Sequence, residues 1–430
     1  MITAKAFAGK HYAVYGLARS GLATAEALLA SGAHVTAWDA KEQARANAPA
    51  GTEIANLDEA DLSQFDSLVV TPGLPLNRHP IAQRARDAAV EIIGDIELFA
   101  RARPELPPHK VVGITGTNGK STTTALIHHI LKTAGVPTEM GGNIGLPILA
   151  QDPLPEGGVY VLELSSYQID LTQSLDCDVA VLLNITPDHL DRYESFEAYA
   201  ASKMRLFAMQ TDQHWAVVAV DDTTIRDKIF DLNDGPGALH IPNEGESIVF
   251  ADQDEFPSLQ GPHNAQNIWA AERVCGSLGI DRDAFEKGLR TYPGLPHRME
   301  RVREKDGVLF VNDSKATNPT ATAPALAAFP SIRWILGGRA KTDELDECAP
   351  HFAHVRSAYT IGEAGELFAK LLAPHMPVSN CETLENALNH AAEDSQPGDT
   401  VLLSPACASF DQFKDFEQRG DRFRDLVGAL

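Results

Sequence analysis

The 430-residue chain has few cysteines and no long apolar run, and each absence excludes a class of protein. Its 5 cysteines are scattered and form no Cys-x-x-Cys pair, which argues against a disulfide framework or a zinc site and indicates a reducing compartment. No stretch approaches the roughly 18 apolar residues of a membrane-spanning helix, and Met1–Lys10 lacks the apolar core of a signal peptide. We therefore expect a cytoplasmic protein without membrane insertion.

Positive charge is also scarce. The chain has 36 Lys and Arg against 59 Asp and Glu, for a formal net charge of -23, and no dense basic run. Such a surface repels nucleic-acid phosphates and acidic membranes. We expect no nucleic-acid partner, and the acidity by itself is typical of a soluble protein.

Short apolar runs alternate with helical patterns along the whole chain, as in parallel α/β folds. A proline-rich stretch at Arg101–Pro108 and a turn-rich stretch at Tyr292–Pro296 divide it into three segments. We predict three α/β domains, at 1–107, 108–298 and 299–430. The predicted strands are His11–Tyr15, His34–Trp38, Ser67–Val70, Val111–Ile114, Val159–Leu164, Val179–Asn184, Val308–Val311, Arg333–Leu336, Ala358–Ile361 and Thr400–Leu403.

The most informative stretch, Gly113–Thr122, lies between a predicted strand and a predicted helix. Its glycines let backbone N–H groups close around phosphate oxygens, and the helix N-terminus adds a favourable dipole. Lys120 would bridge the terminal phosphates of ATP, and the Ser121 hydroxyl would bind Mg²⁺. Ile114 stands where the strict G-x-x-x-x-G-K-[ST] pattern has its first glycine, so the loop is a variant. ATP binding is the prediction, and a glycine-rich turn without a ligand is the alternative.

A second glycine turn, Gly16–Gly21, follows the first predicted strand but lacks the middle glycine of G-x-G-x-x-G. Asp39 ends the next strand, where a ribose-binding acid often lies. Three interpretations stay open: a redox dinucleotide, another nucleotide-like ligand, and a purely structural turn. The nucleotide-like ligand is favoured over the redox cofactor.

Acidic residues follow two strands of the second segment. Glu163 ends an apolar run, and Asn184–Tyr193 brings one His and two Asp after the next strand. Phosphoryl transfer from ATP needs Mg²⁺ and cations to offset the charge of the reacting anions. Alone, Glu163 could equally cap a helix, Asn184–Tyr193 could be a capped loop, and Lys203 could be a solvated lysine.

Taken together, these motifs resemble the Mur ligase superfamily over essentially the whole chain and in the same order. The motifs shared across the superfamily are Gly116–Thr122, Glu163–Gln168, Asn184–Tyr193, His263–Asn267 and His297-Arg298. Those more specific to its D-glutamate-adding members are Asn312–Asn318, Ser404–Phe413 and Phe416–Gly420. The Asp-Asn-Pro-Arg motif of the relatives that add diaminopimelate or lysine is absent from the sequence.

The resemblance implies a Rossmann-like N-terminal domain for a UDP-sugar, a central P-loop ATPase domain, and a Rossmann-like C-terminal domain for an amino acid. It implies an ATP-dependent amide ligase that activates UDP-N-acetylmuramoyl-L-alanine as an acyl-phosphate and couples it to D-glutamate, in peptidoglycan precursor synthesis. The choice of D over L rests on the resemblance alone. We expect a monomer.

The resemblance also implies two Mg²⁺ ions. Ser121 and Glu163 would hold one, and His189 and Lys203 the other. Carbamylation of Lys203 by CO₂ would turn a cation that repels the metal into an anionic oxygen ligand, which suits a hard cation. Lys120, His189 and Lys203 would be the catalytic residues.

The remaining site residues match the family's motifs position by position. The sugar-nucleotide residues would be Arg19, Ser20, Asp39, Thr71, Gly73, Asn143 and His189. The ATP residues would be Gly116, Thr117, Asn118, Gly119, Lys120, Ser121, Thr122, Asn267, Arg298, Asp313 and Lys315. The D-glutamate residues would be Thr317, Lys341, Ser409, Phe410 and Phe416. Phe410 stands where relatives carry leucine, but the matching contact is largely made by the backbone.

Three other functions compete with this interpretation. A folylpolyglutamate synthetase shares the ATPase core and adds glutamate, but usually lacks a full UDP-binding domain such as residues 1–107 suggest. A nucleotide-gated regulatory protein would leave Lys341 and Ser409 unexplained. A dehydrogenase rests only on the weak Gly16–Gly21 turn.

Overall fold

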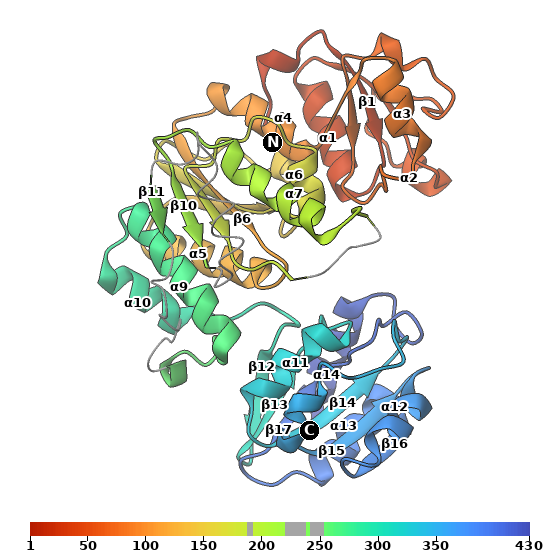
Figure 1. Cartoon of the computed structure of the whole chain (residues 1–430), viewed down its shortest axis with the longest axis vertical. Coiled ribbons are helices and arrows are strands. Elements are labelled where there is room, and N and C mark those ends of the chain that lie inside the picture. The colour runs from red at the N-terminus through yellow and green to blue at the C-terminus, as the bar shows by residue number, and fades with distance from the viewer. Residues whose placement is uncertain (187–191, 220–237, 241–252) are drawn as a thin grey trace. The chain divides into compact units, whose positions relative to one another are not determined.

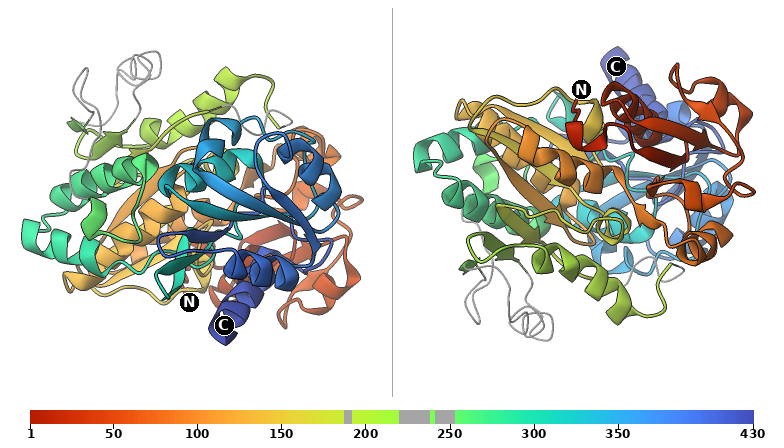
Figure 2. Two further views of the ribbon diagram at one scale, coloured as in Figure 1. Left: turned by 90° about the horizontal axis from the view of Figure 1, so that it is seen from below. Right: turned by 90° about the horizontal axis from the view of Figure 1, so that it is seen from above.

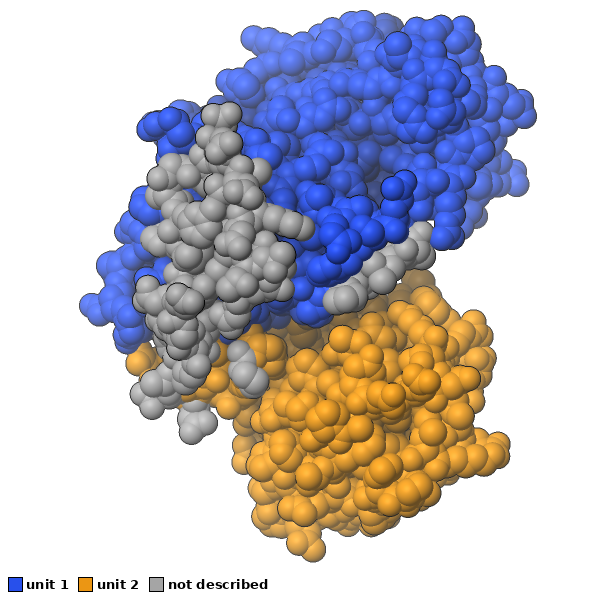
Figure 3. Space-filling view, viewed as in Figure 1, with its two compact units in different colours: residues 1–248, 266–289 blue, residues 249–265, 290–430 orange. Residues whose placement is uncertain are grey.

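The computed structural model of the chain describes residues 1–186, 192–219, 238–240 and 253–430. These residues form two compact units, which Figure 3 shows in different colours: unit 1 comprises residues 1–248 and 266–289, and unit 2 comprises 249–265 and 290–430. Unit 1 contains two β-sheets and unit 2 contains one. Each sheet lies within one of the three predicted domains, and the domain boundaries stay a prediction.

The first sheet has five parallel strands in the order β3-β2-β1-β4-β5. Along β1, Tyr12 and Val14 pack toward helices α1 (Arg19–Ala30) and α4 (Asp95–Ala102). The alternate residues, Ala13 and Tyr15, pack toward α3 (Pro80–Asp87). Helices therefore cover both faces, as the period of two along a buried strand requires. The strands are β1 (His11–Tyr15), β2 (His34–Trp38), β3 (Glu53–Ile54), β4 (Ser67–Val70) and β5 (Glu91–Ile93).

The second sheet has six parallel strands in the order β11-β10-β9-β6-β8-β7, with α5 (Lys120–Thr133) packed against β6, β7 and β8 (Figure 1). One apolar cluster runs through both sheets of unit 1 and includes Val14 of the first sheet, Phe99 of α4 and Leu162 of the second. This shared core explains why the two sheets form one unit. The strands are β6 (His109–Thr115), β7 (Thr138–Gly142), β8 (Gly158–Glu163), β9 (Val179–Leu182), β10 (Trp215–Val218) and β11 (Ala238–His240).

A buried carboxylate reinforces the join between these two sheets. Glu97 of α4 is 1% exposed and accepts hydrogen bonds from the N–H groups of Gln173 (2.7 Å) and Ser174 (2.9 Å) and from the Ser174 hydroxyl (2.8 Å). Arg101 also donates to the Glu97 carboxylate, at 2.8 Å. A buried charge that is well hydrogen-bonded in this way is tolerated, and it ties α4 to Gln173 and Ser174, which precede strand β9 of the second sheet.

The third sheet has the order β12-β13-β17-β14-β15-β16, and only its edge strand β12 is antiparallel (Figures 1 and 2). Trp334 of β14 packs with α11 (Pro319–Ala328) and α12 (Gly365–Leu372), while Ile335 packs with α13 (Leu384–Glu393) and α14 (Phe416–Ala429). This sheet is also covered on both faces. The strands are β12 (Glu300–Lys305), β13 (Val308–Asn312), β14 (Ile332–Gly337), β15 (Val355–Ile361), β16 (Val378–Glu382) and β17 (Thr400–Leu403).

The α/β prediction is confirmed, and β1, β2, β4 and β17 have the predicted bounds. The predicted linker at Arg101–Pro108 is wrong in its first half. There α4 continues to Ala102, and a 3₁₀ helix follows at Arg103–Glu105, because Pro104 occupies an early position where a helix tolerates proline. Across the described residues, no helix is long and apolar enough to cross a membrane.

Candidate functional site

The predicted site residues of unit 1 follow the carboxyl ends of adjacent parallel strands. Gly16 and Thr71 follow the neighbours β1 and β4. In the second sheet Gly116 follows β6, which lies between β8, ending at Glu163, and β9. Both places are points where the strand order reverses, and ligands of open α/β sheets bind in such crevices.

The phosphate loop has the backbone conformation that its glycines allow. Gly116 and Gly119 have φ angles of 150° and 84°. A Cβ atom at Gly119 would lie 2.4 Å from Oδ1 of Asn267, so only glycine lets that side chain approach the loop. The Asn267 side chain also accepts a hydrogen bond from Thr123 at 3.1 Å. The structure thus brings the predicted ATP residue Asn267 against the loop, whereas Thr122 is buried in the first turn of α5.

Asn184 holds the loop from the side of β9. Its carbonyl accepts from Thr117 N at 2.9 Å, and its Oδ1 accepts from Asn118 N at 2.8 Å. Its Nδ2 donates to the Asn118 carbonyl at 3.1 Å. Asn184 was not among the predicted site residues, although its place at the end of a predicted strand and the start of a family motif was a usable signal.

Two lysines converge on one carbonyl of the loop. Lys120 Nζ donates to the carbonyls of Gly116 and Thr117, both at 2.8 Å, and Lys203 Nζ donates to the same Gly116 carbonyl at 3.0 Å. Lys203, on α7 (Phe196–Ala208), is 1% exposed, and its Nζ lies 4.6 Å from the centre of the Tyr199 ring. The alternative of a solvated lysine at position 203 is therefore wrong.

Glu163 is buried and has one free carboxylate oxygen. Asn143 Nδ2 donates to its Oε1 at 3.0 Å, while Oε2 has no hydrogen-bond partner within the described part of the chain. Glu163 does not cap the next helix, because Ser165 and Gln168 form the capping box of α6 (Ser166–Asp170). An unpartnered buried carboxylate oxygen suits a hard cation such as Mg²⁺. Ser121, the other predicted ligand, is buried in the first turn of α5. His189, assigned to a second Mg²⁺ and to the substrate, lies outside the described residues.

In the first sheet, Asp39 and Thr71 surround the Gly16 turn. The Asp39 carboxylate accepts from Leu17 N at 2.8 Å and from Lys41 N at 2.9 Å. Gly16 has a φ of 97°, and a Cβ there would lie 2.4 Å from the Thr71 hydroxyl oxygen. Two of the predicted sugar-nucleotide residues thus shape the turn itself.

A small cavity lies behind the same turn and is lined in part by Ser20 and Asp95. The Asp95 side chain is 4% exposed, its Oδ2 has no partner among the described residues, and burial raises its pKa to about 6. The sequence analysis missed Asp95.

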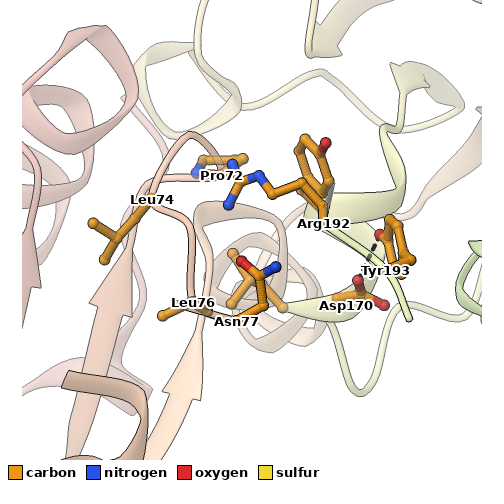
Figure 4. A pocket seen from close by; sticks show the side chains of 9 residues that line it. Pro72, Leu74, Leu76, Asn77, Asp170, Arg192 and Tyr193 are labelled. Carbon is orange, nitrogen blue, oxygen red and sulfur yellow. Dashed lines mark hydrogen bonds between the residues drawn. The ribbon is translucent and has the colours of Figure 1, made fainter. Parts of the chain in front are cut away.

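Two arginines connect the first sheet's loops to the second sheet. Arg19 donates to the Gly145 carbonyl, and Arg192 donates to the Gly73 carbonyl at 2.9 Å while its guanidinium lies 4.5 Å from the centre of the Tyr167 ring. Arg192 was predicted to lie in a motif but was given no role. A pocket of about 150 Å³ opens beside it (Figure 4), lined by Pro72, Leu74, Leu76, Asn77, Tyr167, Asp170, Leu171, Arg192 and Tyr193.

Unit 2 carries the other residues predicted to bind ATP. Asp313 is buried, accepts from the Ser404 hydroxyl at 2.7 Å and from Met299 N at 3.1 Å, and burial raises its pKa to about 7. Arg298 lies between residues with left-handed φ angles, and its buried Nε has no partner in the described ranges. Lys315 Nζ lies 5.6 Å from the Phe416 ring. Because these residues and Asn267 belong to different units, their common ATP role stays a prediction.

The predicted D-glutamate residues lie on loops after β13, β14 and β17 and at the start of α14. Lys341 Nζ donates to the Thr317 hydroxyl at 3.5 Å, and Ser409 is buried. Phe410 is 64% exposed. Its side chain is therefore not packed in a core where a phenylalanine and a leucine would fit differently. Because β17 lies between β13 and β14, the third sheet brings these loops to one edge.

Three family models match consecutive parts of the chain. They describe a MurD-like N-terminal domain of Mur ligases at residues 10–94, a Mur ligase middle domain at 114–275, and a Mur ligase glutamate ligase domain at 297–407. The chain belongs to the Mur ligase family.

Two full-length relatives are both described as UDP-N-acetylmuramoylalanine--D-glutamate ligase. The chain is 61% identical to the protein of Novosphingobium aromaticivorans, with 100% of this chain and 97% of that protein covered. It is 59% identical to the protein of Sphingopyxis alaskensis, with 100% of both covered.

Solved structures show the same fold at low identity. A MurF ligase of Thermotoga maritima in complex with ADP has a TM-score of 0.59 at 17% identity, with 99% of this chain and 97% of that chain covered. The UDP-N-acetylmuramate-alanine ligase of the same organism has a TM-score of 0.58 at 17% identity, with 98% and 99% covered. The three-domain architecture of Mur ligases therefore holds for this chain.

Proposed function

We propose that this chain is an ATP-dependent ligase that joins D-glutamate to UDP-N-acetylmuramoyl-L-alanine during cytoplasmic peptidoglycan precursor synthesis. The observation that carries the proposal is the arrangement at the carboxyl edge of the second sheet. The Gly116 loop with Lys120 follows one strand of this sheet and Glu163 ends its neighbour, and one carboxylate oxygen of Glu163 has no partner among the described residues. The Gly16 turn belongs to the same unit. Relatives that match the chain along its whole length carry the same activity in their names.

The reaction starts with phosphoryl transfer. A carboxylate oxygen of the sugar nucleotide attacks the γ-phosphorus of ATP, the bond to the β-γ bridging oxygen breaks, and ADP leaves. Backbone N–H groups of Gly116–Thr122 would hold the outgoing phosphates, and Lys120 would exchange its present carbonyl partners for phosphate oxygens.

Amide formation follows on the acyl-phosphate. The amino nitrogen of D-glutamate attacks the acyl carbon, the carbon–oxygen bond to phosphate breaks, and the nitrogen loses a proton. Lys341, Thr317, Ser409 and the backbone at Phe410 and Phe416 would orient the amino acid through its carboxylates. Arg298, Asp313 and Lys315 of unit 2 are proposed to bind ATP.

Ser121 and Glu163 would hold Mg²⁺, which would neutralise charge on the phosphates when bound. We propose a second ion at His189 and Lys203, with Lys203 carbamylated. Burial of the Lys203 amine beside the loop supports the assignment, because a modified side chain there would place an oxygen next to the phosphates. ¹³C NMR of protein equilibrated with ¹³C-bicarbonate tests the carbamylation. We expect a carbamate signal in the wild type that is missing in Lys203→Ala. No such signal in the wild type, or the same signal in the variant, would contradict the assignment.

In the N-terminal domain, the turn at Arg19 and Ser20 would take the diphosphate, and Asp39, Thr71 and Gly73 would line the uridine pocket. Asn143 would contact the sugar nucleotide, since its side chain lies beside Glu163. The monomeric state is part of the proposal and is tested by light scattering.

The experiment is phosphate release from ATP with Mg²⁺ and UDP-N-acetylmuramoyl-L-alanine, comparing D-glutamate, L-glutamate and no amino acid. We expect release that depends on both the sugar nucleotide and D-glutamate. Release only with L-glutamate would keep the ligase and change the product. No release in any combination would contradict the proposal, and a folate substrate with glutamate would then be tested.

A further inference from the structure

Arg419 in the Phe416–Gly420 motif is a buried cation that forms no ion pair with a carboxylate of the described residues. Its side chain lies on α14 and is 1% exposed. Its guanidinium donates only to oxygens of uncharged groups among the described residues. Burial lowers its pKa to about 10, so it stays charged at neutral pH. A buried charge is costly unless it is well hydrogen-bonded, so its contacts indicate what it does.

The guanidinium connects three loops. Its Nε donates to the Ser314 hydroxyl at 3.0 Å, and Nη2 donates to the carbonyls of Ser314 at 2.9 Å and Cys407 at 3.0 Å. Nη1 reaches the Gly337 carbonyl at 3.4 Å. Ser314 follows β13, Gly337 ends β14, and Cys407 follows β17. One side chain thus cross-links the carboxyl ends of three neighbouring strands.

These three loops carry the residues proposed to bind D-glutamate. Thr317, Lys341 and Ser409 each follow one of the contacted residues by four positions or fewer. Phe416 begins the helix that carries Arg419, and its carbonyl accepts from the Ser314 hydroxyl at 2.8 Å. Every proposed contact to the amino acid is therefore close in sequence to a group that Arg419 holds or to Arg419 itself.

Two of these loops have backbone conformations that need support. Gly337 and Gly338 have φ angles of 125° and 127°, and Ala406, next to Cys407, has a φ of 56°. For alanine the left-handed region is unfavourable and persists only where surrounding contacts determine it. Arg419 accounts for part of that support, because it hydrogen-bonds the carbonyls of Gly337 and Cys407.

We propose that Arg419 is a positioning residue of the amino-acid site, holding the three loops so that their side chains and N–H groups fit the two carboxylates of D-glutamate. This inference rests on the proposed function. The planar guanidinium donates in several directions at once, whereas a lysine concentrates its donors on one nitrogen. Lysine at position 419 keeps the charge but cannot hold all three loops.

The test is Arg419→Lys in the full-length enzyme, with Arg422→Lys as the matched control. Arg422 lies on the same helix, is 48% exposed and pairs with Glu385 at the surface. We expect Arg419→Lys to raise the KM for D-glutamate about tenfold or more, while the KM values for ATP and the sugar nucleotide stay within about twofold. Arg422→Lys should change none of the three.

A half-reaction separates positioning from a general loss of activity. Hydroxylamine in place of D-glutamate traps the acyl-phosphate as a hydroxamate, and this product needs no ordered amino-acid site. We expect Arg419→Lys to form it at a rate within about twofold of the wild type. Equal loss of hydroxamate formation and of D-glutamate coupling would overturn the proposal, and so would an unchanged KM for D-glutamate.

Ser314→Ala provides a milder variant in case Arg419→Lys does not fold. It keeps the buried charge and removes one acceptor of Arg419, so we expect the KM for D-glutamate to rise about threefold, the range of one hydrogen bond. An unchanged KM in a folded Ser314→Ala would count against the proposal. Absence of D-glutamate-dependent phosphate release in the wild type would instead contradict the proposed function itself.

Discussion

Two glycine turns of unit 1 occupy equivalent places, each after a strand at the point where its sheet's order reverses, but they are held in different ways. The Gly16 turn is held by a carboxylate, because Asp39 accepts from the Leu17 N–H group of the turn and also from the Lys41 N–H group. The Gly116 loop is held by the neutral side chain of Asn184, and Lys120 and Lys203 both donate to its Gly116 carbonyl.

The difference indicates which of the two turns suits the highly charged terminal phosphates of ATP. An anion beside the first turn opposes a second anion, so the ligand there must be held largely by N–H groups and hydroxyls. At the second loop, the Lys120 cation favours the terminal phosphates of ATP and the charge that develops during transfer, while Lys203 is proposed to become a metal ligand. The predictions below test this contrast, from the largest effect to the smallest.

Lys120→Met should have the largest effect. It removes the cation that would stabilise the negative charge on the transferred phosphoryl group, and we expect kcat/KM to fall about a thousandfold. Lys132→Met, at the exposed far end of the same helix, is the control and should leave the rate unchanged. Steady-state phosphate release measures both, and a loss below about tenfold would show that the second loop does not depend on its cation.

Gly16→Ala should weaken the first turn without affecting the second. Its Cβ would lie 2.4 Å from the Thr71 hydroxyl oxygen at a φ of 97°, so we expect the KM for the sugar nucleotide to rise about tenfold and the KM for ATP to stay constant. Gly9→Ala is the control, because Gly9 also has a positive φ but open space around it. Equal effects of the two variants would mean that strain, rather than the Thr71 contact, is responsible.

Asp39→Asn should have a smaller effect. The amide keeps one acceptor oxygen and loses the other, so one of the two N–H groups loses its partner. We expect the KM for the sugar nucleotide to rise about fivefold, which corresponds to about 1 kcal/mol. Asp66→Asn, which removes a similar contact at the opposite end of β1, is the control for general destabilisation. A lower KM in Asp39→Asn would indicate that the carboxylate mainly repels the diphosphate.

Asp95→Asn should affect stability more than activity. Burial raises the Asp95 pKa from 3.8 to about 6, so the folded state binds a proton that the unfolded state has released between these pH values. The free energy of unfolding contributed by this group falls as pH rises through that window and is lowest above it. We expect Asp95→Asn to remove this dependence and to stabilise the protein above pH 6 by about 1–3 kcal/mol.

Urea unfolding at several pH values measures the Asp95 effect. Asp61→Asn is the control, because Asp61 is exposed and its hydrogen bonds with Ser63 lower its pKa instead. Parallel pH profiles of Asp95→Asn and the wild type would contradict the prediction.

Much of the fold could be predicted from local pattern. Strands such as His34–Trp38 and Thr400–Leu403 are short apolar runs bounded by turn residues, and nothing in their surroundings overrides that preference. Strands such as Glu53–Ile54 and Val378–Glu382 were missed, because edge strands are partly exposed and carry mixed polar residues. The first half of the Arg101–Pro108 linker was wrong because Pro104 was taken as a break, whereas it lies inside the 3₁₀ helix Arg103–Glu105.

The candidate site divides in the same way. Gly116–Thr122 has a sequence signature because its residues act through local backbone geometry. Asp95 lies in no such motif, and Asn184 and Arg192 lie in one that did not reveal their partners, because each of the three acts on a segment distant in the chain. Their roles depend on which strands become neighbours, and a single sequence does not state this order.

The sequence by itself determined the α/β class, the phosphate loop and the family, because these depend on periodicity and on contiguous motifs. Only the tertiary structure decided that Lys120 and Lys203 meet at one carbonyl, that one Glu163 oxygen has no hydrogen-bond partner among the described residues, and that Arg419 joins three loops. The physical reason is that parallel strands bring residues far apart in the chain to one sheet edge. Hydrogen bonds and burial then act across distances that no local pattern encodes.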